Sequence, residues 1–248
     1  MAGRWVLIGD GPVPLRSWWA TPPASEHEID TFLFRKRAVI VLPEVFGVNA
    51  WLRSITDRLA AHGIPALAIP LFARTAPDLD LGYADQDLQE GRRHKDATTA
   101  AQILADVSAA ILWLQRCCPA AEVMVVGFCF GGHAALLAAT LPDVVVTLDF
   151  YGAGVSRFRP GGGEPTLALM PHVKGRLTCL FGLADPLIPE DDRLAVAKAL
   201  RQVDPLGDRL RMELFPEADH GFMCDARGSF QAAAAERGWA LMLEAAMA

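Results

Sequence analysis

The sequence predicts an α/β fold in which a mostly parallel central sheet is covered by helices on both faces. Short apolar, β-branched segments alternate along the chain with longer segments of helical periodicity, as is typical of a parallel sheet with helical crossovers. One apolar segment runs into Gly127-Phe128-Cys129-Phe130-Gly131, a pattern typical of a sharp turn from a buried strand into a helix. No linker-like composition separates the candidate active residues, so we expect a single domain, 1–248.

Composition narrows the classes of function. Hydrophobic residues make up 52% of the 248 residues, which is enough for a sizeable core. A net charge of -6 without a dense Lys/Arg cluster argues against a nucleic-acid partner. The sequence has no apolar run of the roughly 20 residues that a membrane span needs, so we expect no membrane partner. The odd number of cysteines and the lack of an export signal favour free thiols in a reducing cytoplasm. No cysteine or histidine cluster has zinc-ligand spacing, and we expect neither a metal nor a cofactor.

Strands are expected where apolar, β-branched residues are bounded by turn signals. The first two flank Gly9-Asp10-Gly11-Pro12, and the later ones precede loops rich in glycine, proline or aspartate. In chain order, the expected strands are Trp5–Ile8, Leu15–Trp19, Thr31–Phe34, Ala38–Leu42, Pro65–Ile69, Val123–Val126, Val144–Phe150, Arg176–Phe181 and Leu210–Phe215.

Helices are expected where apolar residues recur with helical spacing. The first ends at His62-Gly63, a common C-cap signal. The polar stretch between Arg74 and Gln89 is too long for a simple connection and is interpreted as a functional cover or a mobile loop. The expected helices are Asn49–Ala61, about Asp96 to Leu114, a small-residue helix beginning near Gly132, Glu190–Leu200 and Phe230–Ala246.

Cys129 occupies the apex of the glycine-pinched turn, where a nucleophile is exposed in enzymes built on this motif. A thiol at a helix N-terminus lies at the positive end of the helix dipole, which favours the reactive thiolate. The alternative is a buried cysteine in an ordinary strand-to-helix turn, because free cysteine is often buried.

Asp185 and His220 follow the strands Arg176–Phe181 and Leu210–Phe215. Ligands of open α/β sheets bind at the carboxyl ends of the strands, so both residues are expected at one edge with Cys129. Taken singly, Asp185 is also a good turn or N-cap residue, and His220 is also an ordinary loop histidine. The order Cys, Asp, His at three strand ends favours a catalytic triad.

Glu44 follows the strand Ala38–Leu42 and is expected at the same edge, flanked by apolar neighbours. An alternative is that it bonds nearby backbone amides. The loop that carries it is also where such folds supply one oxyanion-hole amide, here that of Val45. The other amide is expected from Phe130.

Five segments, LPEVFGVNAWLR, GFCFGGH, DFYGAG, GLADPLIP and EADHGF, together resemble the dienelactone hydrolase family of α/β-hydrolases. The likeness runs in one register from about Ala38 to the C-terminus. It implies that Cys129 is the nucleophile and that Asp185 and His220 complete its triad. It also implies that Glu44 holds the resting thiol until substrate arrives and then takes its proton. The family's named reaction is the cytoplasmic hydrolysis of 4-carboxymethylenebut-2-en-4-olide to maleylacetate.

The sequence departs from the family's prototype at the two arginines that bind the substrate carboxylate. The position of the first arginine falls near Leu88-Gln89 in this sequence, and Cys224 occupies the position of the second. Because a carboxylate clamp needs a fixed fork of donors, the resemblance predicts the reaction type but not the substrate. The candidate substrate-binding residues are Arg92, Arg93, Tyr151 and Arg227.

The sequence therefore predicts a cysteine-dependent hydrolase of a lactone or activated ester that works through an acyl-enzyme. Two other classes stay open. One is a thiol-redox protein that uses Cys129 with Cys224 as the resolving cysteine. The other is a non-catalytic sensor or scaffold on the same fold. The sequence does not predict the oligomeric state.

Overall fold

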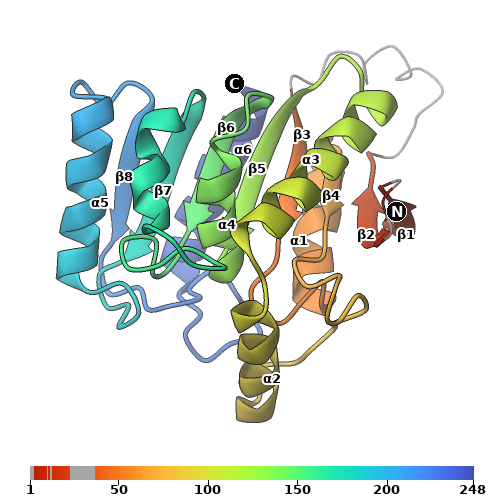
Figure 1. The fold of residues 1–248 in the computed structure, drawn as a ribbon, viewed down its shortest axis with the longest axis horizontal. Helices are drawn as coiled ribbons and strands as arrows, with labels where there is room; N and C mark the ends of the chain where they lie inside the picture. Colours follow the sequence, from red (N-terminus) through yellow and green to blue (C-terminus); the bar gives the residue numbers. More distant parts are fainter. Residues whose placement is uncertain (1–2, 10, 12, 23–36) are drawn as a thin grey trace.

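The central element is an eight-stranded sheet with the strand order β1-β2-β4-β3-β5-β6-β7-β8. The structure is a computed structural model that describes residues 3–9, 11, 13–22 and 37–248 (Figure 1). β1 and β2 pair antiparallel, as do β2 and β4, and all pairs from β4 to β8 are parallel. The strands are β1 (Arg4–Ile8), β2 (Leu15–Ala20), β3 (Arg37–Leu42), β4 (Ala66–Ala68), β5 (Glu122–Phe128), β6 (Val144–Phe150), β7 (Arg176–Gly182) and β8 (Leu210–Phe215).

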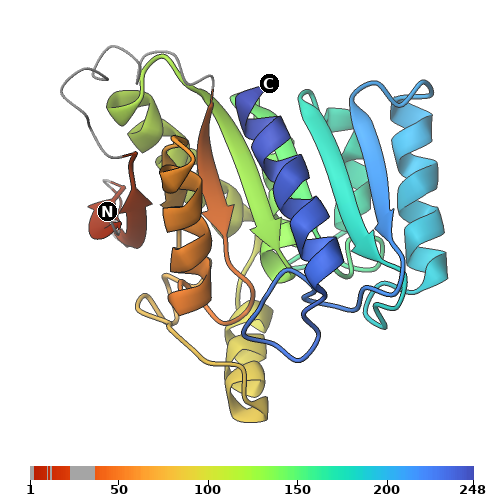
Figure 2. The same ribbon diagram turned by 180° about the vertical axis from the view of Figure 1, so that it is seen from behind.

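Helices cover both faces of the sheet. One face carries α3, α4 and α5, and the other carries α1 and α6 (Figures 1 and 2). Side-chain caps begin three of them: the side chains of Asn49, Thr99 and Gln231 accept from the backbone N–H groups of Leu52, Gln102 and Ala234. The helices are α1 (Ala50–Ala61), α2 (Asp85–Asp96), α3 (Ala100–Cys117), α4 (Phe130–Ala138), the 3₁₀ helix η2 (Thr166–His172), α5 (Glu190–Val203) and α6 (Ala232–Met247).

The predicted α/β architecture is confirmed, and most predicted elements match within a few residues. The expected strand Thr31–Phe34 lies outside the described residues. The main difference concerns the helix expected from about Asp96, because α3 begins at Ala100 and a separate helix, α2, precedes it. α2 also takes up the end of the stretch expected as a cover or mobile loop.

The α2 sequence, DQDLQEGRRHKD, has almost no apolar periodicity from which a helix is predicted. Its charge pattern matches the helix dipole, with acidic residues in the first turn and basic residues in the last. The Asp87 carboxylate also accepts a hydrogen bond from the Ala84 backbone N–H (3.0 Å). α2 projects beyond the edge of the sheet at which the parallel strands end (Figure 1). This helix therefore lies over the edge where ligands of such sheets bind.

Among the described residues, no single helix has the length and apolar composition to cross a bilayer. Only α2 and α3 together satisfy both criteria, and the pair is bent by 93°.

Asp149 is a fully buried carboxylate near the end of β6. Its Oδ1 accepts a hydrogen bond from the Gly152 backbone N–H (2.8 Å), and its Oδ2 has no partner among the described residues. Burial raises the pKa of Asp149 to about 7, against the opposing effect of the Gly152 hydrogen bond. Since the unfolded chain binds this proton less tightly, deprotonating Asp149 reduces the free energy of unfolding.

We expect Asp149 to make the protein less stable as the pH rises from the ordinary value of 3.8 to about 7. Asp149→Asn keeps the Oδ1 acceptor for Gly152 but removes the charge, so the melting temperature of the variant should fall less across this range. Thermal unfolding of both proteins at a series of pH values measures this difference. Asp143→Asn, which changes an exposed carboxylate, is the control. Identical pH profiles for parent and Asp149→Asn would contradict the prediction.

Candidate active site

The turn from β5 into α4 places Cys129 at the carboxyl edge of the sheet. Cys129 adopts a left-handed backbone conformation (φ 54°), which is uncommon for a residue with a side chain. A Cβ on Gly127 would lie 1.8 Å from the Gly131 carbonyl oxygen, and a Cβ on Gly131 would lie 2.3 Å from that of Leu42. Only glycine fits at these two positions, so backbone packing maintains the strained turn and leaves Cys129 partly exposed.

Asp185 and His220 form a buried hydrogen-bonded pair from the loops after β7 and β8. The His220 Nδ1 lies 2.8 Å from the Asp185 Oδ2. The other oxygen, Oδ1, accepts from the Leu187 backbone N–H (2.8 Å), which fixes the carboxylate in place. A carboxylate held in this way orients the imidazole and stabilises its protonated form.

The other ring nitrogen of His220 is directed to the candidate nucleophile. Nε2 is buried without a hydrogen-bond partner in the described part of the chain, and Cys129 lies close enough for the two charges to interact. Burial lowers the pKa of His220, but the Cys129 charge and the Asp185 hydrogen bond outweigh it and raise the pKa to about 10. The site therefore favours the imidazolium form of His220.

Phe130 and Val45 are the two residues whose backbone amides were predicted to stabilise an oxyanion. Phe130 is the first residue of α4, so its N–H has no acceptor inside the helix. Val45 follows β3 on the opposite side of the turn. Both residues line the same cavity as Cys129. That these two amides form an oxyanion hole stays a prediction.

Glu44 is buried, and its partner is Arg227. The Glu44 Oε1 accepts a hydrogen bond from the Arg227 Nη1 (2.7 Å), and Oε2 is buried without a partner among the described residues. Burial raises the pKa of Glu44, while the charges of Arg227 and His220 act in the opposite direction. The resemblance implied that Glu44 holds the Cys129 thiol, but the structure gives its hydrogen bond to Arg227. The two residues are 183 positions apart, so sequence spacing contains no signal for this pair.

A cavity of about 370 Å³ opens at Cys129 and His220. Its apolar wall includes Phe46, Leu88, Phe130, Phe158 and Leu187. Four cationic residues also line it, and none of the lining residues in the described chain is acidic: the cations are Arg92, Lys95, Arg157 and Arg227. Of these four, only Arg92 and Arg227 were predicted from the sequence as substrate-binding residues. Lys95 could have been found from its helical spacing to Arg92 if α2 had been predicted.

Two candidate substrate-binding residues do not reach this cavity. Arg93 lies on the outer side of α2, with a 71% exposed side chain, and pairs with Glu90 (2.5 Å). Tyr151 is fully buried against His220, with 5.2 Å between the ring centroids. Adjacent helical positions point about 100° apart, so Arg92 and Arg93 cannot both face the cavity.

Cys224, the candidate resolving cysteine, is also fully buried and does not line the cavity. It is hydrogen-bonded with Tyr83, whose hydroxyl in turn accepts from Asn49 Nδ2 (3.1 Å). All five cysteines are unpaired. Within the described residues, no group of three or more His, Cys, Asp or Glu side chains is arranged to hold a metal ion.

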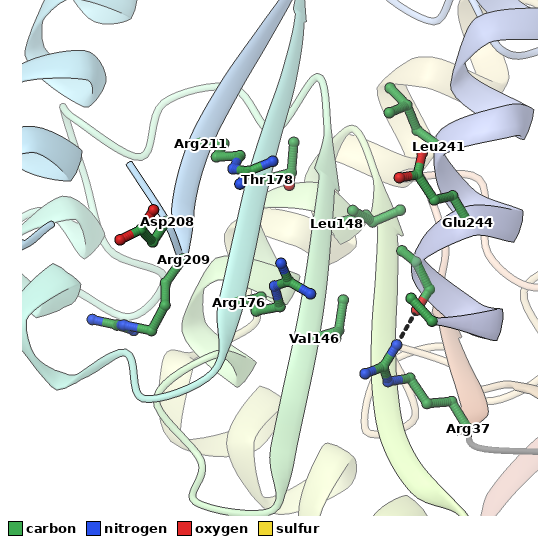
Figure 3. A pocket seen from close by; sticks show the side chains of 12 residues that line it. Arg37, Val146, Leu148, Arg176, Thr178, Asp208, Arg209, Arg211, Leu241 and Glu244 are labelled. Carbon is green, nitrogen blue, oxygen red and sulfur yellow. Dashed lines mark hydrogen bonds between the residues drawn. The ribbon is translucent and has the colours of Figure 1, made fainter. Parts of the chain in front are cut away.

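A second cavity, of about 120 Å³, lies beside α6 over β6, β7 and β8 (Figure 3). Two of its arginines are bound to backbone carbonyls: Arg37 donates to that of Ala245, and Arg209 donates to three carbonyls from Val173 to Gly175. It contains none of the candidate catalytic residues, so the cavity at Cys129 is the candidate active site.

Comparison with known proteins identifies the family. The model of the dienelactone hydrolase family matches residues 27–246. The chain belongs to the dienelactone hydrolase family. It is 40% identical to a Synechocystis sp. protein over 81% of both chains, and 31% identical to an Escherichia coli protein over 83% of this chain and 74% of that one. Both relatives are named "Putative carboxymethylenebutenolidase". A Bradyrhizobium sp. relative, "Probable 2-oxo-3-(5-oxofuran-2-ylidene)propanoate lactonase", is 27% identical over 96% of this chain and 91% of that one.

Solved structures agree with this result. A crystal structure from Klebsiella pneumoniae, titled as a "Putative Dienelactone Hydrolase", superimposes with a TM-score of 0.83 at 25% identity, over 98% of this chain and 97% of that one. The predicted family and the α/β-hydrolase fold are confirmed. Because its relatives are named as lactone hydrolases, the protein is a hydrolase.

We expect His220→Gln to slow alkylation of Cys129 by iodoacetamide at neutral pH about tenfold or more, because the cation that favours the thiolate is lost. Peptide mass spectrometry measures the rate at each cysteine, and exposed Cys117 in the same protein serves as the internal control. An unchanged rate at Cys129 would show that His220 does not stabilise its thiolate.

Proposed function

We propose that this protein hydrolyses a lactone or activated ester through a thioester formed on Cys129. The observation that carries the proposal is the hydrogen-bonded Asp185–His220 pair, whose free Nε2 lies beside a cysteine at a strand-to-helix turn. The names of the relatives support a lactone as the substrate class. We also propose that the protein works in the cytoplasm, in keeping with its five unpaired cysteines.

The proposed first step uses the groups around the turn. The Cys129 thiolate attacks the carbonyl carbon, and the negative charge that develops on oxygen is stabilised by the amides of Phe130 and Val45. The C–O bond then breaks, and the leaving oxygen takes the proton of the His220 imidazolium. In a lactone the leaving oxygen stays attached to the acyl chain.

Deacylation uses the same histidine as a base. His220, now neutral and oriented by Asp185, takes a proton from water, and the resulting hydroxide attacks the thioester carbonyl. The thiolate leaves, the acid is released, and the imidazolium–thiolate pair is restored. No cofactor enters this sequence of steps.

Arg227 and Glu44 provide a means of responding to an anionic substrate. A substrate carboxylate that binds Arg227 competes with Glu44 for the same guanidinium. Glu44 then loses its main counter-charge in a buried site, which raises its affinity for a proton. In this scheme Glu44 takes the Sγ proton of Cys129 only after substrate has bound, which yields the attacking thiolate, and it returns this proton to Cys129 when the product leaves Arg227.

We expect Cys129→Ala to reduce hydrolysis to the background rate on every substrate of a panel of lactones and aryl esters. Asp185→Asn should lower kcat about 10³-fold to 10⁴-fold, because the amide orients His220 in the wrong tautomer. The double variant should lose no more than Cys129→Ala alone, since triad members act as a unit. Full activity of Cys129→Ala would place the nucleophile elsewhere.

A second prediction concerns Glu44→Gln, which removes the proton acceptor and also frees Arg227. We expect kcat on a carboxylate-bearing ester to fall about tenfold or more, while KM stays the same or falls because Arg227 no longer has a competing carboxylate. Steady-state kinetics with the carboxylate-bearing ester separates the two effects. Unchanged kcat would show that Glu44 serves only to hold Arg227.

A further inference from the structure

The charge of the active-site cavity contrasts with that of the chain. The protein has a net charge of -6, yet four of the fourteen residues that line the cavity are arginine or lysine and none is acidic. Arg227 is adjacent to the nucleophile and is bound to Glu44. The remaining three cations come from two other elements, so they form a separate group.

Two of them lie on one face of α2. Leu88, Arg92 and Lys95 follow the spacing i, i+4 and i+7, which brings their side chains to the same side of the helix. The same face contains Gly91, where a Cβ would lie 2.3 Å from the Val45 carbonyl oxygen. A glycine at this position lets α2 pack directly against the proposed oxyanion loop, and this packing brings Arg92 and Lys95 to the cavity.

The third cation, Arg157, comes from the loop after β6 and is held in place. It pairs with Asp192 (2.6 Å) and donates to the Leu187 carbonyl (2.8 Å). The Lys95 Nζ lies 5.4 Å from the ring centroid of Phe158, the residue next to Arg157, so the α2 face meets this loop across the cavity.

The local counter-charges do not neutralise the group. Asp192 pairs with Arg157, and exposed Asp96 pairs with Lys95. Arg92 has no acidic partner among the described residues. The exposed apolar side chains Phe158 and Leu187 line the same cavity as these cations and Cys129. An anion with an apolar body therefore finds complementary groups here.

We propose that Arg92, Lys95 and Arg157 form a second anion subsite, which binds a carboxylate at the end of the substrate remote from the scissile carbonyl. The inference rests on the proposed hydrolase function and narrows its substrate class. The substrate is an ester or lactone with two carboxylates, one for Arg227 and one for the second anion subsite, joined by an apolar segment.

Matched aryl esters test the subsite. Mono-4-nitrophenyl adipate and suberate carry a terminal carboxylate, and 4-nitrophenyl hexanoate and octanoate are neutral esters of the same lengths. We expect kcat/KM to be about tenfold higher for the charged member of at least one pair, a typical effect of one charge-assisted contact, and to approach that of the neutral member at high salt.

Variants locate the origin of this preference. Arg92→Gln and Arg157→Gln should each reduce the ratio of charged to neutral kcat/KM several-fold. Arg93→Gln is the matched control, because it removes the same charge from the same helix outside the cavity, and it should keep the parent ratio. A ratio that is lost in Arg227→Gln but kept in both other variants would overturn the second subsite.

A binding measurement separates this inference from the proposed chemistry. Calorimetry with free suberate and the Cys129→Ala protein should give a dissociation constant that rises about tenfold on adding Arg92→Gln. If neutral esters are turned over in a Cys129-dependent way but suberate neither binds nor confers preference, the subsite is wrong and the hydrolase stands. If suberate binds in an Arg92-dependent way but no ester is hydrolysed, the subsite stands and the proposed function is wrong.

Discussion

The close packing of β5, α4 and their neighbours is the constraint on which the site depends. Gly127 and Gly131 leave no room for a Cβ, so the chain passes from strand to helix within one residue. Cys129 takes up the strain as a left-handed conformation. The backbone on both sides of Cys129 is packed against carbonyl oxygens, that of Gly131 at Gly127 and that of Leu42 at Gly131, which fixes the position from which the side chain extends. A strained but rigid turn fixes the thiol relative to the sheet edge, and every other candidate residue is positioned by a loop at that edge.

Electrostatics at this edge depend on burial more than on the number of charges. Asp185, His220 and Glu44 are all buried, so each must be stabilised by a neighbour or lose its charge. Asp185 and Cys129 together favour the cationic form of His220. Glu44 has Arg227 instead, and it keeps one oxygen unpaired at the same time. The result is two neighbouring acid–base pairs, Asp185–His220 and Glu44–Arg227. Both Asp185 oxygens accept hydrogen bonds, whereas only one Glu44 oxygen does.

Much of the fold and part of the site could be predicted from sequence. Buried parallel strands are short apolar runs, so their positions along the chain followed from pattern, and the ends of these strands placed Cys129, Asp185 and His220 at one edge. α2 could not be predicted from periodicity, because its stability comes from charge placement and its packing depends on Gly91. Without that helix, Arg92 and Arg93 were equivalent candidates, although a helix turns them to different sides. The pairing of Glu44 with Arg227 joins distant segments and needed the structure.

The cationic side chains of the cavity repel one another, and this electrostatic repulsion explains how their acidic partners are arranged. Four like charges around about 370 Å³ repel one another, and partial desolvation by Phe46, Phe130 and Phe158 strengthens that repulsion. The structure offsets it with Asp192 and Glu44, which pair with Arg157 and Arg227 but do not line the cavity. The net charge around these two arginines therefore stays moderate. An anionic substrate is then attracted to the cavity, even though the net negative charge of the whole protein repels it at long range. Salt screens this long-range repulsion beyond about 10 Å, so the cations of the cavity dominate close to it.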